Sequence, residues 1–144
     1  MSTLNVETIQ SISSGPPVFK NSSGTERGQL AKAWVNFDGT SAGTNKTIRA
    51  SFNVDSVTDL AVGRYRVNFS NNMISNDGYA VVGKIGQSGT NGDHGVLMLM
   101  DGFGGASEDL ILASSVTVEV HRGTSSAEFM DKKNVHLVVF GDQS

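Results

Sequence analysis

The sequence predicts an all-β fold, an antiparallel β-sandwich or jelly-roll-like knob, and three observations support this prediction. Glycine, serine, threonine and asparagine make up well over a third of the 144 residues, and charged residues are only 17%. Turn formers are therefore abundant and helix formers sparse. Apolar and polar residues alternate in many short segments between polar turns, which is the period of a half-buried strand. No segment shows a heptad or a longer internal repeat.

The first 30 residues are predicted to form an extended arm that precedes the knob, which is expected over residues 31–144. Both prolines of the chain lie in this arm, within a glycine- and serine-rich segment. Consecutive prolines favour an extended, non-helical path and lack two backbone donors. Such an arm can dock by adding a strand to the edge of a partner's sheet. The residues expected to dock are Leu4, Val6, Ile9, Pro16 and Pro17.

The first strands of the knob are predicted from alternation. One covers residues 32–38, a second covers 46–54 with a break near Ser51, and a hairpin follows over 56–70. The second arm of the hairpin alternates cleanly, which predicts one buried and one outward face. The residues predicted inward are Tyr65, Val67 and Phe69, and those predicted outward are Arg64, Arg66 and Asn68.

Further strands are predicted later in the chain, over residues 79–86, 96–100, 116–122 and 135–140, and residues 101–115 are predicted as mostly loop. In the strand 116–122, valines alternate with three polar residues, so these three are predicted to point outward. The three residues are Thr117, Glu119 and His121.

Several predicted strands are apolar on a face that should meet water. Trp34, the only tryptophan, lies between Lys32 and Asn36 on the polar face of its strand. Exposed apolar patches usually mark an interface. Either loops of the same chain cover these faces, or another copy of the chain does, which favours an obligate homo-oligomer. The predicted interface residues are Trp34, Val96, Leu97, Met98, Leu99, Met100, Val138 and Phe140.

Charge and composition argue against several classes of function. The net charge is −3 and the chain has no cysteine, so neither a basic nucleic-acid surface nor a disulfide framework is expected. The longest apolar run, residues 96–100, is far too short to span a membrane. The N-terminus lacks the basic and apolar regions of a signal peptide. We therefore expect neither nucleic-acid binding nor membrane insertion.

No motif in the chain predicts catalysis or a metal site. The histidines His94, His121 and His136 have no convergent spacing, so they are interpreted as ordinary surface or edge residues and not as metal ligands. The carboxylates are scattered, and a glycosidase would need two of them across a cleft. No nucleophile elbow is present. We expect no enzyme activity and no cofactor, and a small carbohydrate-binding or hydrolytic β-module stays an alternative.

Three blocks of the chain carry a family resemblance: KAWVNFDGT (32–40), TIRASFNVDSVTD (47–59) and GRYRVNF (63–69). They resemble a block of bacteriophage tail-fibre and related virion appendage proteins that reads KAWVNFNGTG, IR-x-SFNVSSITD and GDYTVNFT. The opening TLNVETIQ (3–10) and YAVV (79–82) are similar to other parts of these proteins. The matching residues of the three blocks are Trp34, Phe37, Gly39, Ile48, Arg49, Ser51, Phe52, Asn53, Val54, Thr58, Asp59, Val67, Asn68 and Phe69.

The resemblance implies a non-enzymatic virion structural protein that forms a homotrimeric knob. Its N-terminal part would attach to capsid or tail proteins, and its distal loops would contact a host surface polysaccharide. Residues 96–100 are expected to line the threefold axis. The chain has no long shaft, so a short appendage fits better than a long fibre, and a trimeric capsid decoration or cement protein at threefold positions is the alternative. The candidate receptor residues are Asn91, Asp93, His94, Phe103, Ser125 and Ser126.

Overall fold

The structure is a computed structural model that describes residues 19–20, 22–28, 30–86, 95–99, 111–122 and 128–141. The contacts of the chain divide it into two units, residues 1–30 and residues 31–144. In the N-terminal unit, β1 (Phe19–Lys20) pairs with β2 (Glu26–Gly28) as a short antiparallel hairpin. The sequence predicts an extended arm here, without this hairpin.

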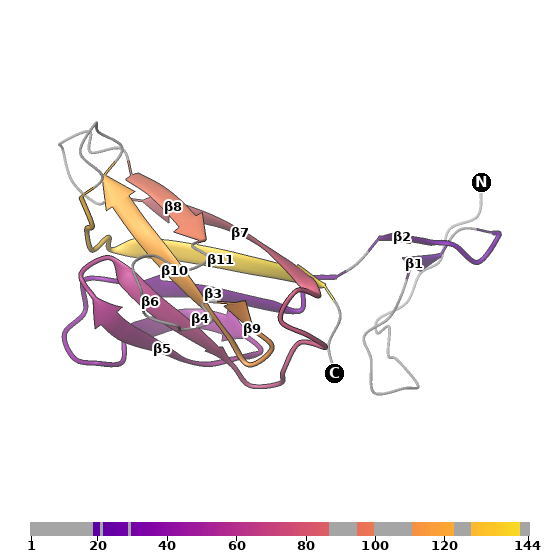
Figure 1. Ribbon diagram of the computed structural model, residues 1–144, viewed down its shortest axis with the longest axis horizontal. Coiled ribbons are helices and arrows are strands. Elements are labelled where there is room, and N and C mark those ends of the chain that lie inside the picture. The colour runs from indigo at the N-terminus through magenta and orange to yellow at the C-terminus, as the bar shows by residue number, and fades with distance from the viewer. Residues whose placement is uncertain are drawn as a thin grey trace. The chain divides into compact units, whose positions relative to one another are not determined.

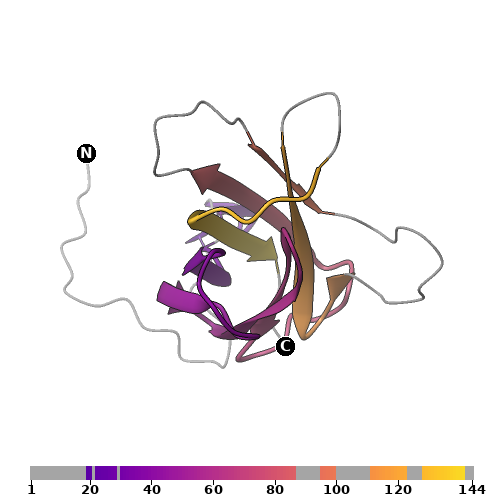
Figure 2. The same cartoon turned by 90° about the vertical axis from the view of Figure 1, so that its left-hand side faces the viewer.

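The C-terminal unit consists of two antiparallel sheets, which confirms the predicted all-β sandwich (Figures 1 and 2). The first sheet has the order β4-β3-β11-β7, with bounds Thr47–Phe52, Ala33–Asp38, Asn134–Gly141 and Tyr79–Gly86. The second has the order β5-β6-β10-β8, with bounds Val54–Ala61, Arg64–Phe69, Ser115–Arg122 and Gly95–Leu99. The short strand β9 (Ile111–Leu112) pairs with β10 beside this order. No described residue is helical, so this part of the chain contains no helix that could span a membrane.

The core lies between the two sheets and is built from the inward residues of alternating strands. In β6, Tyr65, Val67 and Phe69 are buried and the residues between them are only half-buried, as predicted. Edge-to-face contacts connect the sheets, with ring centroids 5.1 Å apart for Phe37 and Tyr65 and 5.8 Å apart for Phe69 and Tyr79. Such aromatic pairs stabilise a core beyond the area they bury.

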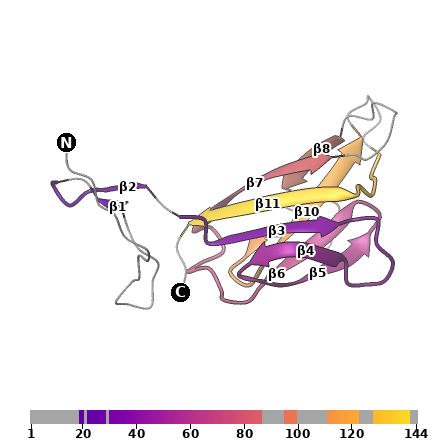
Figure 3. The same cartoon turned by 180° about the vertical axis from the view of Figure 1, so that it is seen from behind.

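The connections between strands gather at two opposite ends of the C-terminal unit (Figures 1 and 3). We call the end where this unit begins the arm-side end, and it also carries the β4–β5 corner, residues 70–78 and Gly141. We call the opposite end the loop end. Register places residues 39–46, residues 62–63, the strand ends Gly86 and Gly95, and residues 128–133 at the loop end. Antiparallel pairing therefore separates the surface of the unit into two distinct poles.

The chain changes sheets at Asn53, two residues after the break predicted near Ser51. Asn53 has φ 53, in the left-handed region that asparagine tolerates better than most residues. Its amide nitrogen donates to the carbonyls of Lys32 at 3.0 Å and Asn71 at 3.1 Å, and its Oδ1 accepts from the Asn71 backbone N–H at 2.7 Å. Asn53 thus stabilises the corner between β4 and β5 with its own side chain.

Strand β10 corrects the prediction of an outward polar face. Thr117 and Glu119 are each only 1% exposed, and His121 is 8% exposed, so all three are buried. The interpretation of His121 as an ordinary surface residue was therefore wrong. Alternation identifies the two faces of a strand, but it does not reveal whether a second layer covers the polar one.

Candidate functional site

The outer face of the β4-β3-β11-β7 sheet carries a row of large apolar side chains at the arm-side end. Register aligns Phe52, Trp34, Val138 and Val82 across all four strands. We call these four residues the apolar row. Phe52 is 53% exposed, Trp34 38% and Val82 54%, whereas Val138 is partly buried between its neighbours. Since adjacent strands lie about 4.8 Å apart, the row spans about 14 Å.

The apolar character is confined to one half of the sheet. Phe140, which is 38% exposed, extends the row one pair further toward the arm-side end. In the other direction the next row consists of Ala50, Asn36, His136 and Lys84. Trp34 is therefore only partly covered by the part of the chain that the structure describes.

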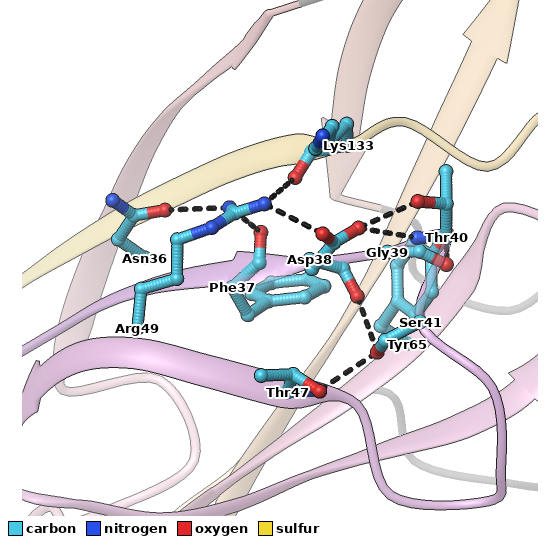
Figure 4. A network of polar contacts seen from close by, with 10 residues as sticks. All are labelled: Asn36, Phe37, Asp38, Gly39, Thr40, Ser41, Thr47, Arg49, Tyr65 and Lys133. Atoms are coloured by element: carbon cyan, nitrogen blue, oxygen red, sulfur yellow. Dashed lines mark hydrogen bonds and ion pairs between the residues drawn. The ribbon is translucent and has the colours of Figure 1, made fainter.

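At the loop end, Arg49 connects three segments of the chain (Figure 4). Its Nη2 donates to Asp38 Oδ2 at 2.7 Å and to the Lys133 carbonyl at 2.7 Å, and its Nη1 donates to the Phe37 carbonyl at 3.0 Å and to Asn36 Oδ1 at 3.2 Å. One guanidinium thus joins β3, β4 and the segment before β11, using most of its donors on fixed acceptors.

The turn after β3 is held by Asp38. Its Oδ1 accepts from the Thr40 hydroxyl at 2.6 Å and from the Thr40 N–H at 3.0 Å. The hydrogen bonds from Thr40, with a smaller contribution from the charge of Arg49, lower the pKa of Asp38 below its ordinary value. Beside it, Gly39 has no room for a side chain, because a Cβ there would lie 2.6 Å from the Tyr65 hydroxyl.

Tyr65 and Asp131 form a hydrogen bond that connects segments at the loop end. The Tyr65 hydroxyl donates to Asp131 Oδ1 at 2.6 Å, and the same oxygen accepts from the Gly63 N–H at 2.8 Å. Burial, followed by the hydrogen bond to Asp131, raises the pKa of Tyr65. Lys46 forms a further link, with its Nζ 2.7 Å from Asp59 Oδ2.

The residues of the family-like blocks fall into two groups in this structure. Gly39, Arg49 and Asn53 shape or connect turns, and Asn68 donates to Ser56 Oγ at 3.0 Å and to Thr58 Oγ1 at 3.1 Å. These residues stabilise the fold. Trp34 and Phe52 are different, because they are the exposed large apolar side chains of these blocks and face each other across β3 and β4.

A second group of charged residues lies on the outer face of the other sheet, near the loop end. Arg64 Nε donates to Glu119 Oε1 at 2.7 Å, and His121 Nε2 lies 3.0 Å from Glu119 Oε2. The ring of Phe129 lies against His121, with centroids 4.4 Å apart, and the Arg64 Cζ is 6.0 Å from the Phe129 centroid. We call Arg64, Glu119, His121 and Phe129 the Glu119 cluster.

The structure places only some of the residues predicted from the sequence. Trp34, Val138 and Phe140 share the outer face of the first sheet, whereas Leu97 is partly buried against the core. Val96, Met98 and Leu99 belong to β8, an edge strand in the described order of the second sheet. The remaining predicted residues lie outside the described residues, and they are Leu4, Val6, Ile9, Pro16, Pro17, Asn91, Asp93, His94, Met100, Phe103, Ser125 and Ser126.

Two surfaces were missed by sequence reasoning. Phe52 and Val82 join Trp34 only through strand register, which alternation within one strand does not reveal. The pairing of Arg64 with Glu119 joins residues of two different strands in the same way. Among the described residues, no three histidine or carboxylate side chains gather so that they could hold a metal ion.

Comparisons with known proteins give one structural likeness. No protein-family model matches the chain, and no curated protein matches it with significance. A solved structure that resembles it is the crystal structure of the phiAB6 tailspike in complex with three-repeated oligosaccharides of Acinetobacter baumannii surface polysaccharide, at 15% sequence identity and a TM-score of 0.47. The likeness covers 96% of this chain and 30% of the tailspike chain. The chain thus spans about a third of the length of that protein.

Proposed function

We propose that this chain is a non-enzymatic structural protein of a phage virion, a short homotrimeric appendage attached through its N-terminal unit. The observation that carries this proposal is the apolar row, which the chain leaves exposed at its arm-side end. The resemblance of residues 32–40, 47–59 and 63–69 to virion appendage proteins supports it from the sequence.

In this proposal, further copies of the same chain cover the apolar row. A flat sheet face that carries tryptophan and phenylalanine beside valines offers the aromatic anchors that dominate interface energies. In a closed ring each copy contributes the same face, so one set of apolar residues is buried in every subunit. The number three comes from the family resemblance.

The distribution of side chains supports an orientation for the appendage. The apolar row lies at the arm-side end, while Arg49, Asp38 and the Glu119 cluster lie toward the loop end. Assembly at one pole and polar groups at the other are consistent with docking through the N-terminal unit and with contacts to the host at the loop end. Either a tail-fibre-like or a capsid-decoration position on the particle would use the same two poles.

The decisive experiment measures the mass of the purified chain by light scattering at low micromolar concentration. We expect three times the mass of one chain for the wild type and a smaller mass for Trp34→Ala. Leu60→Ala is the matched control, because Leu60 is 40% exposed on the other sheet. A monomeric wild type, or a Trp34→Ala variant with wild-type mass, would contradict the proposed assembly.

The position on the particle needs a separate experiment. Deletion of residues 1–12 is expected to abolish attachment to purified capsids or tails while the trimer persists. The fraction of the full-length chain that sediments with capsids or with tails identifies which of the two particles is the partner. Attachment to both particles without residues 1–12 would contradict docking through the N-terminal unit.

A further inference from the structure

We propose that the Glu119 cluster presents a binding site for a sugar ring that carries a carboxylate, with Phe129 as the apolar platform and Arg64 as the anion-binding group. This inference deepens the proposed function, on which its biological setting rests, by naming a ligand class and a location for recognition at the loop end. An approaching ligand would first meet two groups, Phe129 and Arg64.

Phe129 is an exposed aromatic ring that the backbone holds in place. The residue is 44% exposed, although one part of its ring lies against His121. Its backbone is fixed on both sides, because the Arg122 N–H donates to the Glu128 carbonyl at 2.8 Å and the Met130 N–H donates to the Val120 carbonyl at 3.0 Å. A ring on a fixed backbone, with one side against a neighbouring ring, has fewer conformations to lose when a ligand stacks on it.

Arg64 is oriented by a buried carboxylate. Glu119 is 1% exposed and accepts from the Nε of Arg64, while the Arg64 side chain is 33% exposed. Since Nε points inward to Glu119, the terminal nitrogens of the guanidinium remain for groups outside the cluster. They make no hydrogen bond to any of the residues that the structure describes.

The stability of the fold does not explain this arrangement well. Burying a charged pair costs desolvation energy that the attraction often fails to offset, so well-packed apolar residues would serve stability as well or better. The cluster is also incomplete as a structural network. Among the described residues, neither the Nδ1 of His121 nor the Oγ1 of Thr117, the next polar residue of β10 beside the cluster, has a hydrogen-bond partner, and both residues are more than nine-tenths buried. Unsatisfied buried polar atoms are uncommon and need an explanation.

The chemistry of the two accessible groups defines the ligand. A guanidinium binds a carboxylate through two parallel hydrogen bonds, and such charge-assisted bonds are about twice as strong as neutral ones. The face of a phenylalanine ring accepts the apolar face of a ring-shaped ligand. The neighbouring ion pair of Arg122 and Glu128, with Nη1 and Oε2 3.3 Å apart, adds balanced charge beside the site. A carboxylated saccharide combines both features that the site would recognise.

The test begins with the full chain on an array of oligosaccharides that pairs carboxylated members with their methyl esters. We expect binding to a carboxylated member and at least tenfold weaker binding to its ester. Calorimetry with the carboxylated oligosaccharide that binds is then expected to show at least a tenfold loss of affinity for Phe129→Ala and for Arg64→Gln. Phe19→Ala is the matched control, because Phe19 is an exposed phenylalanine of the N-terminal unit and is expected to leave affinity unchanged.

Several results would overturn the site. They are no binding to any carboxylated oligosaccharide of the array, equal binding to acid and ester, or wild-type affinity in Phe129→Ala. If Arg64→Gln fails to fold by circular dichroism, Phe129→Ala still decides, because Phe129 is partly exposed and outside the buried core. Saccharide binding by a monomeric chain would overturn the proposed trimer and support this site. A trimer that binds no saccharide would overturn this site alone.

Discussion

The hydroxyl of Tyr65 donates a 2.6 Å hydrogen bond to Oδ1 of Asp131, an atom that also accepts from the backbone N–H of Gly63. One carboxylate oxygen thus connects a core residue of β6, the turn before it and the segment that leads into β11. These three segments meet only in the folded chain, so the bond should contribute to global stability.

Tyr65→Phe is expected to lower the free energy of unfolding by about 1–3 kcal/mol, because the variant loses a hydrogen bond to a charged acceptor. Urea unfolding followed by circular dichroism measures the change. Tyr79→Phe is a useful comparison, since the Tyr79 hydroxyl donates to two backbone carbonyls, those of Leu112 at 2.8 Å and Ser115 at 3.1 Å. An unchanged urea midpoint for Tyr65→Phe would show that the bond to Asp131 does not stabilise the fold.

Alkaline pH should destabilise the protein through the same two tyrosines. Burial raises the pKa of Tyr79 to about 12, and burial together with Asp131 raises that of Tyr65. The ordinary value is 10.0, so in the unfolded chain both phenols ionise first. Their contribution to stability is complete below pH 10 and is lost as pH rises from there through the folded-state pKa values. Urea midpoints between pH 8 and 11 should fall, and a flat profile would contradict the raised pKa values.

Acidic pH should destabilise the protein through Asp38, whose pKa is lowered in the folded chain. Its pKa in the folded chain lies below the ordinary 3.8, so its contribution to stability is present above pH 3.8 and is lost as pH falls through the lower folded-state value. Asp38→Asn is expected to be less stable at pH 7 and to show a smaller loss between pH 5 and 2.5. A variant with the acid profile of the wild type would exclude Asp38 as a contributor.

The two turn glycines offer a matched pair of substitutions. Gly63 has φ 67, and a Cβ there would lie 2.6 Å from the Val120 carbonyl oxygen, whereas Gly43 has φ 94 with open space around it. Both alanine variants carry the cost of a left-handed backbone, about 1 kcal/mol. Gly63→Ala is expected to cost clearly more than Gly43→Ala in urea unfolding, because β10 must also move. Equal costs would show that the close approach is relieved without penalty.

The cross-strand pairing of Trp34 with Phe52 can be tested by a double-mutant cycle on assembly. If the apolar row is an interface core, each single alanine variant should weaken self-association at least tenfold. Because the two side chains are cross-strand neighbours, the double variant should lose less than the sum of the single losses. Sedimentation equilibrium supplies the association constants. Strict additivity would place the two side chains in independent environments.

Sequence alternation predicted the strands well where one face is buried and the other meets water. β6 is an example, since Tyr65 and Val67 are buried on one side and Arg66 lies half-buried on the other. In β10, alternation did not predict the burial of the polar face. Its polar residues are buried as well as its valines, and no pattern within a single strand carries that information.

Register was the other limit of prediction from sequence. Trp34 was identified as unusual, but its neighbours Phe52 and Val82 come from strands whose pairing depends on the whole sheet. The chain's turn at Asn53 was misplaced by two residues for a related reason. A left-handed corner depends on side-chain bonds to Lys32 and Asn71, which are distant in the sequence.

The separation of the two poles has an evolutionary consequence. The strand ends Gly86 and Gly95 and the segment 128–133 lie at the opposite end from Trp34 and Phe52. Lengthening or exchanging the connection between β7 and β8 would leave every pair of the apolar row in register. If the apolar row is the proposed interface between subunits, changes at the loop end can alter ligand contacts without altering self-association.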